Sequence, residues 1–83
     1  MILRIREMTA LGGTSLQLAF TNGEQKQVDL APLLDGPIFE RLHDPAYFAQ
    51  VELDPVCGTV VWPNGADFAP EALLALPAID QRT

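Results

Sequence analysis

One histidine, one cysteine and one isolated serine are the side chains of this sequence that suggest nucleophilic or acid–base chemistry. A catalytic triad or a cysteine–histidine pair would have to join His43, the only histidine, to Cys57 or Ser15. His43, however, precedes Asp44-Pro45, a pattern typical of a capped turn at a helix start. Ser15 begins a predicted strand and lacks the strand–turn–helix setting of a nucleophilic serine. We therefore predict no catalytic residues and expect a protein that is not an enzyme.

Cys57 has two interpretations, a redox-sensitive thiol or an incidental residue in an exposed hairpin loop. A reactive thiolate needs nearby cations, and residues 43–83 contain one basic residue, Arg82, against six acidic ones. The pattern favours the incidental interpretation. A single cysteine also excludes an intrachain disulfide, which suits the reducing cytoplasm where we expect the protein to be located.

Four carboxylates in the second half of the chain are candidate ligands for a divalent cation: Glu52, Asp54, Asp67 and Glu71. Their spacing matches no calcium loop, since neither a D-x-D-x-D-G run nor a glutamate at the twelfth position is present. The charged outward face of a strand and the start of a helix explain them adequately, with dipole and capping roles for Asp67 and Glu71. We predict no bound metal and no cofactor.

The run Trp62-Pro63-Asn64-Gly65-Ala66-Asp67-Phe68 contains the most restricted backbone of the chain, because proline fixes φ and glycine accepts positive φ. In one interpretation it is a partner-binding patch, since tryptophan is enriched in such patches. In the other, Trp62 fills the core, Gly65 takes positive φ, and Asp67 bonds back to turn or helix amides. We favour the structural interpretation, because so small a domain needs its one tryptophan inside. The candidate partner-binding residues are Trp62, Asn64, Asp67 and Phe68.

Alternating apolar residues predict an N-terminal strand over residues 2–8 and two hairpins. In the first hairpin, only a three-residue loop, Thr21-Asn22-Gly23, places Leu16 and Leu18 opposite Val28 and Lys26 on one face. In the second hairpin, pairing Leu53 with Val60 and Val51 with Trp62 gathers all four on one face and leaves Val61 on the other.

Short helices are predicted where proline can occupy the first helical position. These are one turn around Pro32 that stops at Asp35-Gly36-Pro37, a helix with Asp44 as N-cap, and a helix over 70–76 with Ala69 as N-cap. Adjacent hairpins with short helices favour an α+β fold, a small antiparallel sheet of two hairpins plus an N-terminal strand with two or three short helices. We expect one domain over residues 1–83, with its core in 2–76 and a frayed tail over 77–83.

The net charge of −6 repels phosphate backbones, so we expect no direct binding to nucleic acid. No apolar window is long enough to span a membrane, so we expect no membrane partner. The acidic surface is compatible with a basic protein partner. A homodimer through a strand edge, or through the face that carries Val61, is also expected.

Much of the chain, roughly residues 2–76, resembles the bacterial domain-of-unknown-function family 2442. The resemblance lies in Phe20, Asn22-Gly23-Glu24, Val28-Asp29-Leu30, Leu33-Leu34, Ile38-Phe39, Leu42, Asp44-Pro45, Phe48 and the run from Gly58 to Asp67. It implies a small α+β bacterial domain that sometimes stands alone and is sometimes fused ahead of a helix-turn-helix module. Stand-alone members tend to be encoded beside another small protein, which suggests toxin–antitoxin pairs. The sequence departs from the family pattern at Ala69, where relatives often have a serine or a similar capping residue before the proline.

Two functions follow from these observations. The first is a non-enzymatic protein-interaction module, the antitoxin-like member of a small two-gene system, whose partner is another small protein encoded nearby. The alternative is a regulatory ligand-sensing domain associated with a DNA-binding module.

Overall fold

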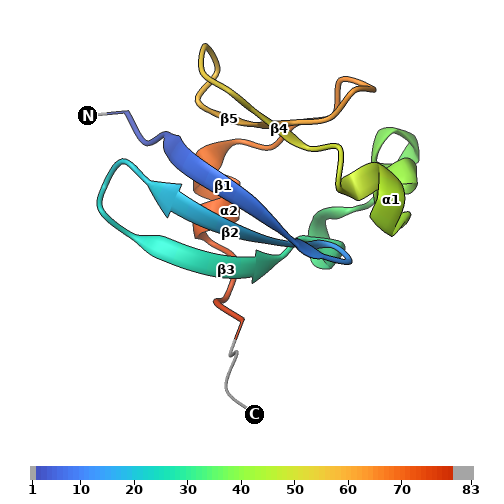
Figure 1. Ribbon diagram of the computed structural model, residues 1–83, viewed down its shortest axis with the longest axis horizontal. Coiled ribbons are helices and arrows are strands. Elements are labelled where there is room, and N and C mark those ends of the chain that lie inside the picture. The colour runs from blue at the N-terminus through green and yellow to red at the C-terminus, as the bar shows by residue number, and fades with distance from the viewer. Residues whose placement is uncertain (1, 80–83) are drawn as a thin grey trace.

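The computed structural model describes residues 2–79, which form two small antiparallel sheets and short helices (Figure 1). The first sheet has the strand order β1-β2-β3, and the second pairs β4 with β5. This arrangement confirms the predicted α+β class. Residues 80–83 of the predicted frayed tail lie outside the described range. The elements are β1 (Ile5–Gly12), β2 (Ser15–Phe20), β3 (Gln25–Asp29), η1 (Ala31–Leu33), η2 (Pro37–His43), α1 (Pro45–Phe48), β4 (Glu52–Asp54), β5 (Thr59–Val61) and α2 (Pro70–Leu74).

The first hairpin has the predicted register. Leu16 lies opposite Val28 and Leu18 opposite Lys26, so the apolar side chains of both strands share the core face. Gly23 takes a φ of +92°, and the amide of Phe20 donates to the carbonyl of Glu24 at 2.8 Å, which closes the three-residue loop. The hydrophobic pattern therefore determined the loop length.

The N-terminal strand lies later in the chain than predicted. It runs over Ile5–Gly12 instead of residues 2–8, because Gly12 and Gly13, both at positive φ, turn the chain directly into β2. The strand contains two register shifts against β2, between Ile5 and Glu7 and between Ala10 and Gly12. Ahead of the strand, the amide of Arg4 donates to the hydroxyl of Thr21 at 3.0 Å.

The second hairpin has the predicted pairing of Leu53 with Val60 but forms a sheet of its own. It contacts the first sheet through the amide of Ile5, which donates to the carbonyl of Gly58 at 2.8 Å. Beyond β5 the chain turns back, and Asp67 forms an isolated bridge with Val61. β4, β5 and the segment around Asp67 therefore lie side by side.

The helices are short, and α1 and α2 begin at the predicted prolines, Pro45 and Pro70. The carboxylate of Asp44 accepts from the amide of Ala46 at 3.0 Å and caps α1, as predicted. Helix η2 was not predicted, because Asp35-Gly36-Pro37 was interpreted as a stop. Gly36, at a φ of +92°, does turn the chain, but Pro37 then starts the next helix with its pre-set φ.

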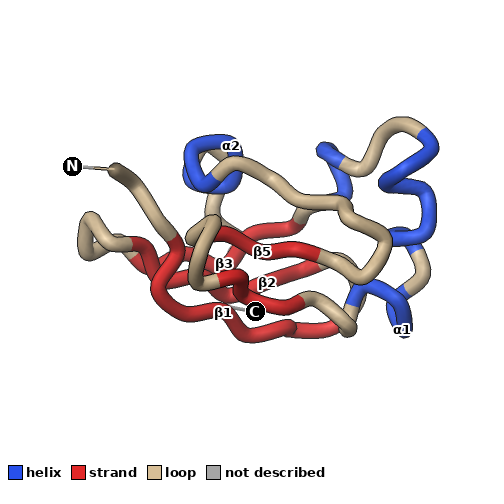
Figure 2. The backbone as a smooth tube through the Cα atoms, turned by 90° about the horizontal axis from the view of Figure 1, so that it is seen from above, coloured by secondary structure: helices blue, strands red, loops and turns tan. Residues whose placement is uncertain are grey.

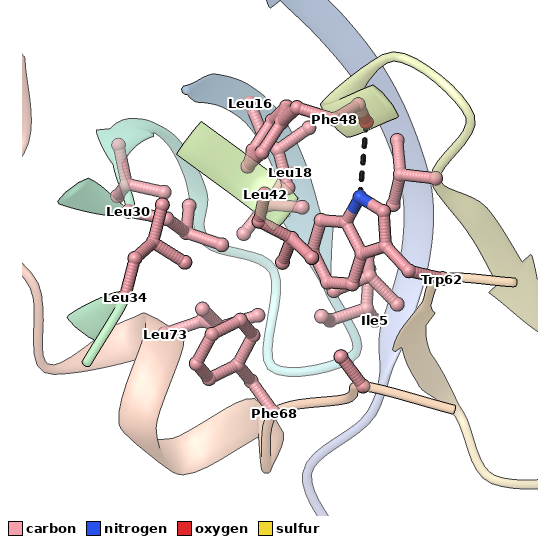
Figure 3. Packing of buried hydrophobic residues seen from close by; sticks show 14 of the residues in the cluster. Ile5, Leu16, Leu18, Leu30, Leu34, Leu42, Phe48, Trp62, Phe68 and Leu73 are labelled. Carbon is pink, nitrogen blue, oxygen red and sulfur yellow. Dashed lines mark hydrogen bonds between the residues drawn. The ribbon is translucent and has the colours of Figure 1, made fainter. Parts of the chain in front are cut away.

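The core lies between the first sheet and the remaining elements, and Figure 2 shows α2 on one side of that sheet. Trp62, only 3% exposed, lies in this core, where its Nε1–H donates to the carbonyl of Phe48 at 3.0 Å (Figure 3). Its ring contacts Phe48 at 5.2 Å and Phe68 edge-on at 5.8 Å between centroids. Phe39 stacks on Phe68 at 4.9 Å. The fully buried residues with the largest side chains are Phe20, Phe48, Leu16, Leu18, Leu30, Leu42, Leu73, Val28 and Val60.

Replacing Trp62 with alanine is expected to lower the free energy of unfolding by about 3–5 kcal/mol, because it removes a large buried ring and leaves a cavity. Chemical denaturation of the purified variant measures this change. Trp62→Phe is the matched control: it keeps an aromatic ring but leaves the carbonyl of Phe48 without its donor, so we expect a smaller loss. An alanine variant as stable as the parent would contradict this role for Trp62.

Ala69→Ser is expected to raise the free energy of unfolding by about 0.5–1 kcal/mol. Ala69 is the N-cap of α2, with φ −66° and ψ 141°, and no side chain caps the helix. A serine hydroxyl there accepts from a free amide of the first turn. Thermal or chemical denaturation measures the gain, with Ala75→Ser at the other end of the helix as control. A lower stability of the N-cap variant would show that these amides are already satisfied.

Candidate functional site

The run from Trp62 to Phe68 forms a closed loop between β5 and α2. The amide of Gly65 donates to the carbonyl of Trp62, and the amide of Trp62 donates to the carbonyl of Ala66, each at 2.9 Å. Gly65 takes the predicted positive φ, +89°. Asn64 Oδ1 accepts from the amide of Ala66 at 3.0 Å. Asn64 therefore makes the side-chain bond to a turn amide that the sequence analysis gave to Asp67.

A second bond of Asn64 ties the loop to η2. Its Nδ2 donates to the carbonyl of Ile38 at 2.9 Å, so both ends of the amide bond to backbone groups. Beneath the loop, the hydroxyl of Thr59 donates to the carbonyl of Phe68. Bonds from both sides thus fix the conformation of this loop.

The four candidate partner-binding residues point in different directions. Trp62 and Phe68 are buried in the core, as Figure 3 shows, and Asn64 is half-buried with its amide directed to η2. Asp67 is exposed. The structure therefore does not bring these side chains together on one surface, and a role for them in binding a partner stays a prediction.

The titratable groups singled out in the sequence act within turns. Asp54 accepts from the amides of Val56 at 2.8 Å and Cys57 at 3.3 Å, and these bonds lower the pKa of its carboxyl. The negative charge of Asp54 in turn raises the pKa of the exposed Cys57 thiol. The thiol is thereby held in its protonated, less reactive form, in agreement with the incidental interpretation. His43 Nε2 donates to the carbonyl of Leu34 at 2.9 Å, which requires a proton on Nε2.

Two further polar contacts were not predicted from the sequence. The hydroxyl of Thr14 donates to Asp29 at 2.6 Å and, with the amide of Ala31, lowers the pKa of that carboxyl. The ammonium of Lys26 donates to carbonyls at the end of α2. The sequence could have indicated a buried role for Lys26, because the hairpin register places this lysine opposite Leu18 on the core face.

Among residues 2–79, no three or more His, Cys, Asp or Glu side chains are grouped as a metal site would require. The same part of the chain encloses no pocket. Within the described range, the helices all fall short of the length and hydropathy that crossing a bilayer requires.

The fold matches a crystal structure of a putative DNA binding protein from Nitrosomonas europaea, with a TM-score of 0.76 and 25% sequence identity. The match covers 89% of this chain and 48% of that protein, so the chain spans about half the length of its structural relative. None of the curated proteins is significantly similar to the chain in sequence.

This match contradicts the expectation that the chain does not bind nucleic acid directly. That expectation was wrong because it took the net charge of 83 residues as decisive. A net charge averages over a whole surface, and it does not exclude a local site that binds nucleic acid. The same fold occurs within the putative DNA binding protein of Nitrosomonas europaea.

The matched sequence range decides the family. Residues 5–76 match the family described as a protein of unknown function, DUF2442, which is most of the chain and includes both sheets and α2. The antitoxin-like role is not addressed by either match and stays a prediction. The resemblance noted from the sequence is confirmed, and the chain belongs to the DUF2442 family.

Proposed function

We propose that this chain is a non-catalytic regulatory domain that works together with a DNA-binding module through protein–protein contacts. One observation carries the proposal: nearly the whole chain, 89%, matches 48% of a putative DNA binding protein. The domain therefore recurs as one part of a longer protein. A part that recurs in this way is suited to control or position the other part.

The polar side chains that were considered as candidates for catalysis or binding support recognition by shape rather than catalysis. His43, Asp54 and Asn64 each bond to backbone groups of neighbouring turns. Side chains used in this way stabilise the loops that form the surface. A surface of fixed loops suits the binding of a folded partner, because little conformational entropy is lost on association.

The net charge of the chain does not by itself decide its partner, but it is compatible with a basic DNA-binding module. The chain carries five basic and eleven acidic residues, whereas a DNA-binding module presents a basic surface to phosphates. Opposite charges attract the two modules and speed their encounter. When the acidic domain covers the basic surface it competes with DNA, which gives the domain a means of regulation.

Chromatin precipitation with the tagged chain in its own host tests this proposal. We expect discrete DNA sites to be enriched together with a second, basic protein that binds those sites in vitro. Adding the purified chain to that protein is expected to change its DNA affinity at least about tenfold at low salt, and less at high salt as the attraction is screened.

The matched control is Leu16→Asp, which places an unpaired charge in the core and unfolds the domain while keeping it acidic. Loss of enrichment in this variant shows that the fold is needed, and not charge alone. If the parent chain enriches no DNA and changes no DNA-binding protein's affinity, the proposal is wrong.

A further inference from the structure

Lys26 is a lysine placed on the core face of a sheet. It lies in β3 directly opposite Leu18, and the next inward residue of that strand is the fully buried Val28. The side chain is half-buried. A charge in this position needs strong hydrogen-bond acceptors, because burying an unpaired ammonium is costly.

The acceptors are carbonyls at the end of α2. Nζ donates to the carbonyl of Leu74 at 2.6 Å and also to that of Leu76. The last carbonyls of a helix have no partners within the helix, and they lie at the negative end of its dipole. A cation there forms charge-assisted bonds, which are stronger than neutral ones. Lys26 thus joins β3 to the point where α2 ends.

The next residue of β3, Gln27, binds the segment that follows α2. The carbonyl of Gln27 accepts from the amide of Ile79 at 2.7 Å. Figure 1 shows this segment leaving α2 behind the sheet and passing β3. Two neighbouring residues of one strand therefore bind three positions between Leu74 and Ile79.

We propose that Lys26 is a latch that keeps residues 77–79 on β3, and that its loss releases this segment while the sheets stay folded. The first sheet is held by fully buried apolar side chains such as Leu16 and Val28. Leu76 belongs to the same core, whereas the chain beyond it is tied to β3 by the bond between the amide of Ile79 and the carbonyl of Gln27. While the segment is in place, Ile79 occupies the carbonyl of Gln27. Release exposes this part of the edge of β3 to another strand.

Amide hydrogen exchange of the full chain, followed by NMR, tests the latch in the Lys26→Met variant. Methionine keeps a long apolar stem but donates no hydrogen bond. We expect the amide of Ile79 to exchange at least about tenfold faster than in the parent, while the amides of Leu16 and Leu18 keep their protection. Arg41→Met is the matched control: it removes a cation that lies 4.4 Å from the ring of Tyr47 and should leave Ile79 unchanged.

Two outcomes overturn the latch. In the first, Ile79 exchanges in the methionine variant as it does in the parent, so Lys26 does not hold the segment. In the second, Leu16 and Leu18 lose protection by the same factor as Ile79. Lys26 would then stabilise the whole domain rather than this segment.

Discussion

The burial of one indole ring unites parts of this chain that share no secondary structure. Trp62 follows the second sheet, donates its Nε1–H to the end of α1, and packs edge-on against Phe68 ahead of α2. Neither sheet is large enough to enclose a core alone, since a two-stranded hairpin is marginal in water. The two sheets depend on each other through the aromatic cluster around this ring and through the bond between Ile5 and Gly58. This need for a shared core explains why the loop after Trp62 is so restricted.

The acidic and amide side chains shape the remaining loops. Each of five accepts from the amide two residues further on, a bond that mimics a backbone turn. Asp29 and Asp54 are ionised in this role, and their hydrogen bonds lower their carboxyl pKa values. Part of the negative charge of the chain thus has a structural origin. The five side chains are Asn22, Asp29, Asp44, Asp54 and Asn64.

The sequence predicted best where two local rules agreed. In the β2–β3 hairpin, the apolar pattern and Gly23 indicate the same loop, and at α1, Asp44 and Pro45 indicate the same start. Prediction was poorer where the same residues are compatible with two different local structures. Gly12-Gly13 is a turn and was interpreted as a break, and Gly36-Pro37 ends one helix but also begins the next.

The contacts of the candidate site were harder to predict, because they join residues far apart in the chain. The bond from Asn64 to Ile38 spans 26 residues, and the bond from Lys26 to Leu74 spans 48. No local pattern encodes such pairs. They follow from how the elements pack once the core has formed.

The edges of the strands have a consequence for the behaviour of the protein in bulk. Sheets aggregate by adding strands to long, regular edges. Here β1 is broken by two register shifts, β5 is bridged by Asp67, and β3 is crossed by Ile79. Together with a net charge of −6, these interruptions oppose the growth of fibrils when many copies are crowded together.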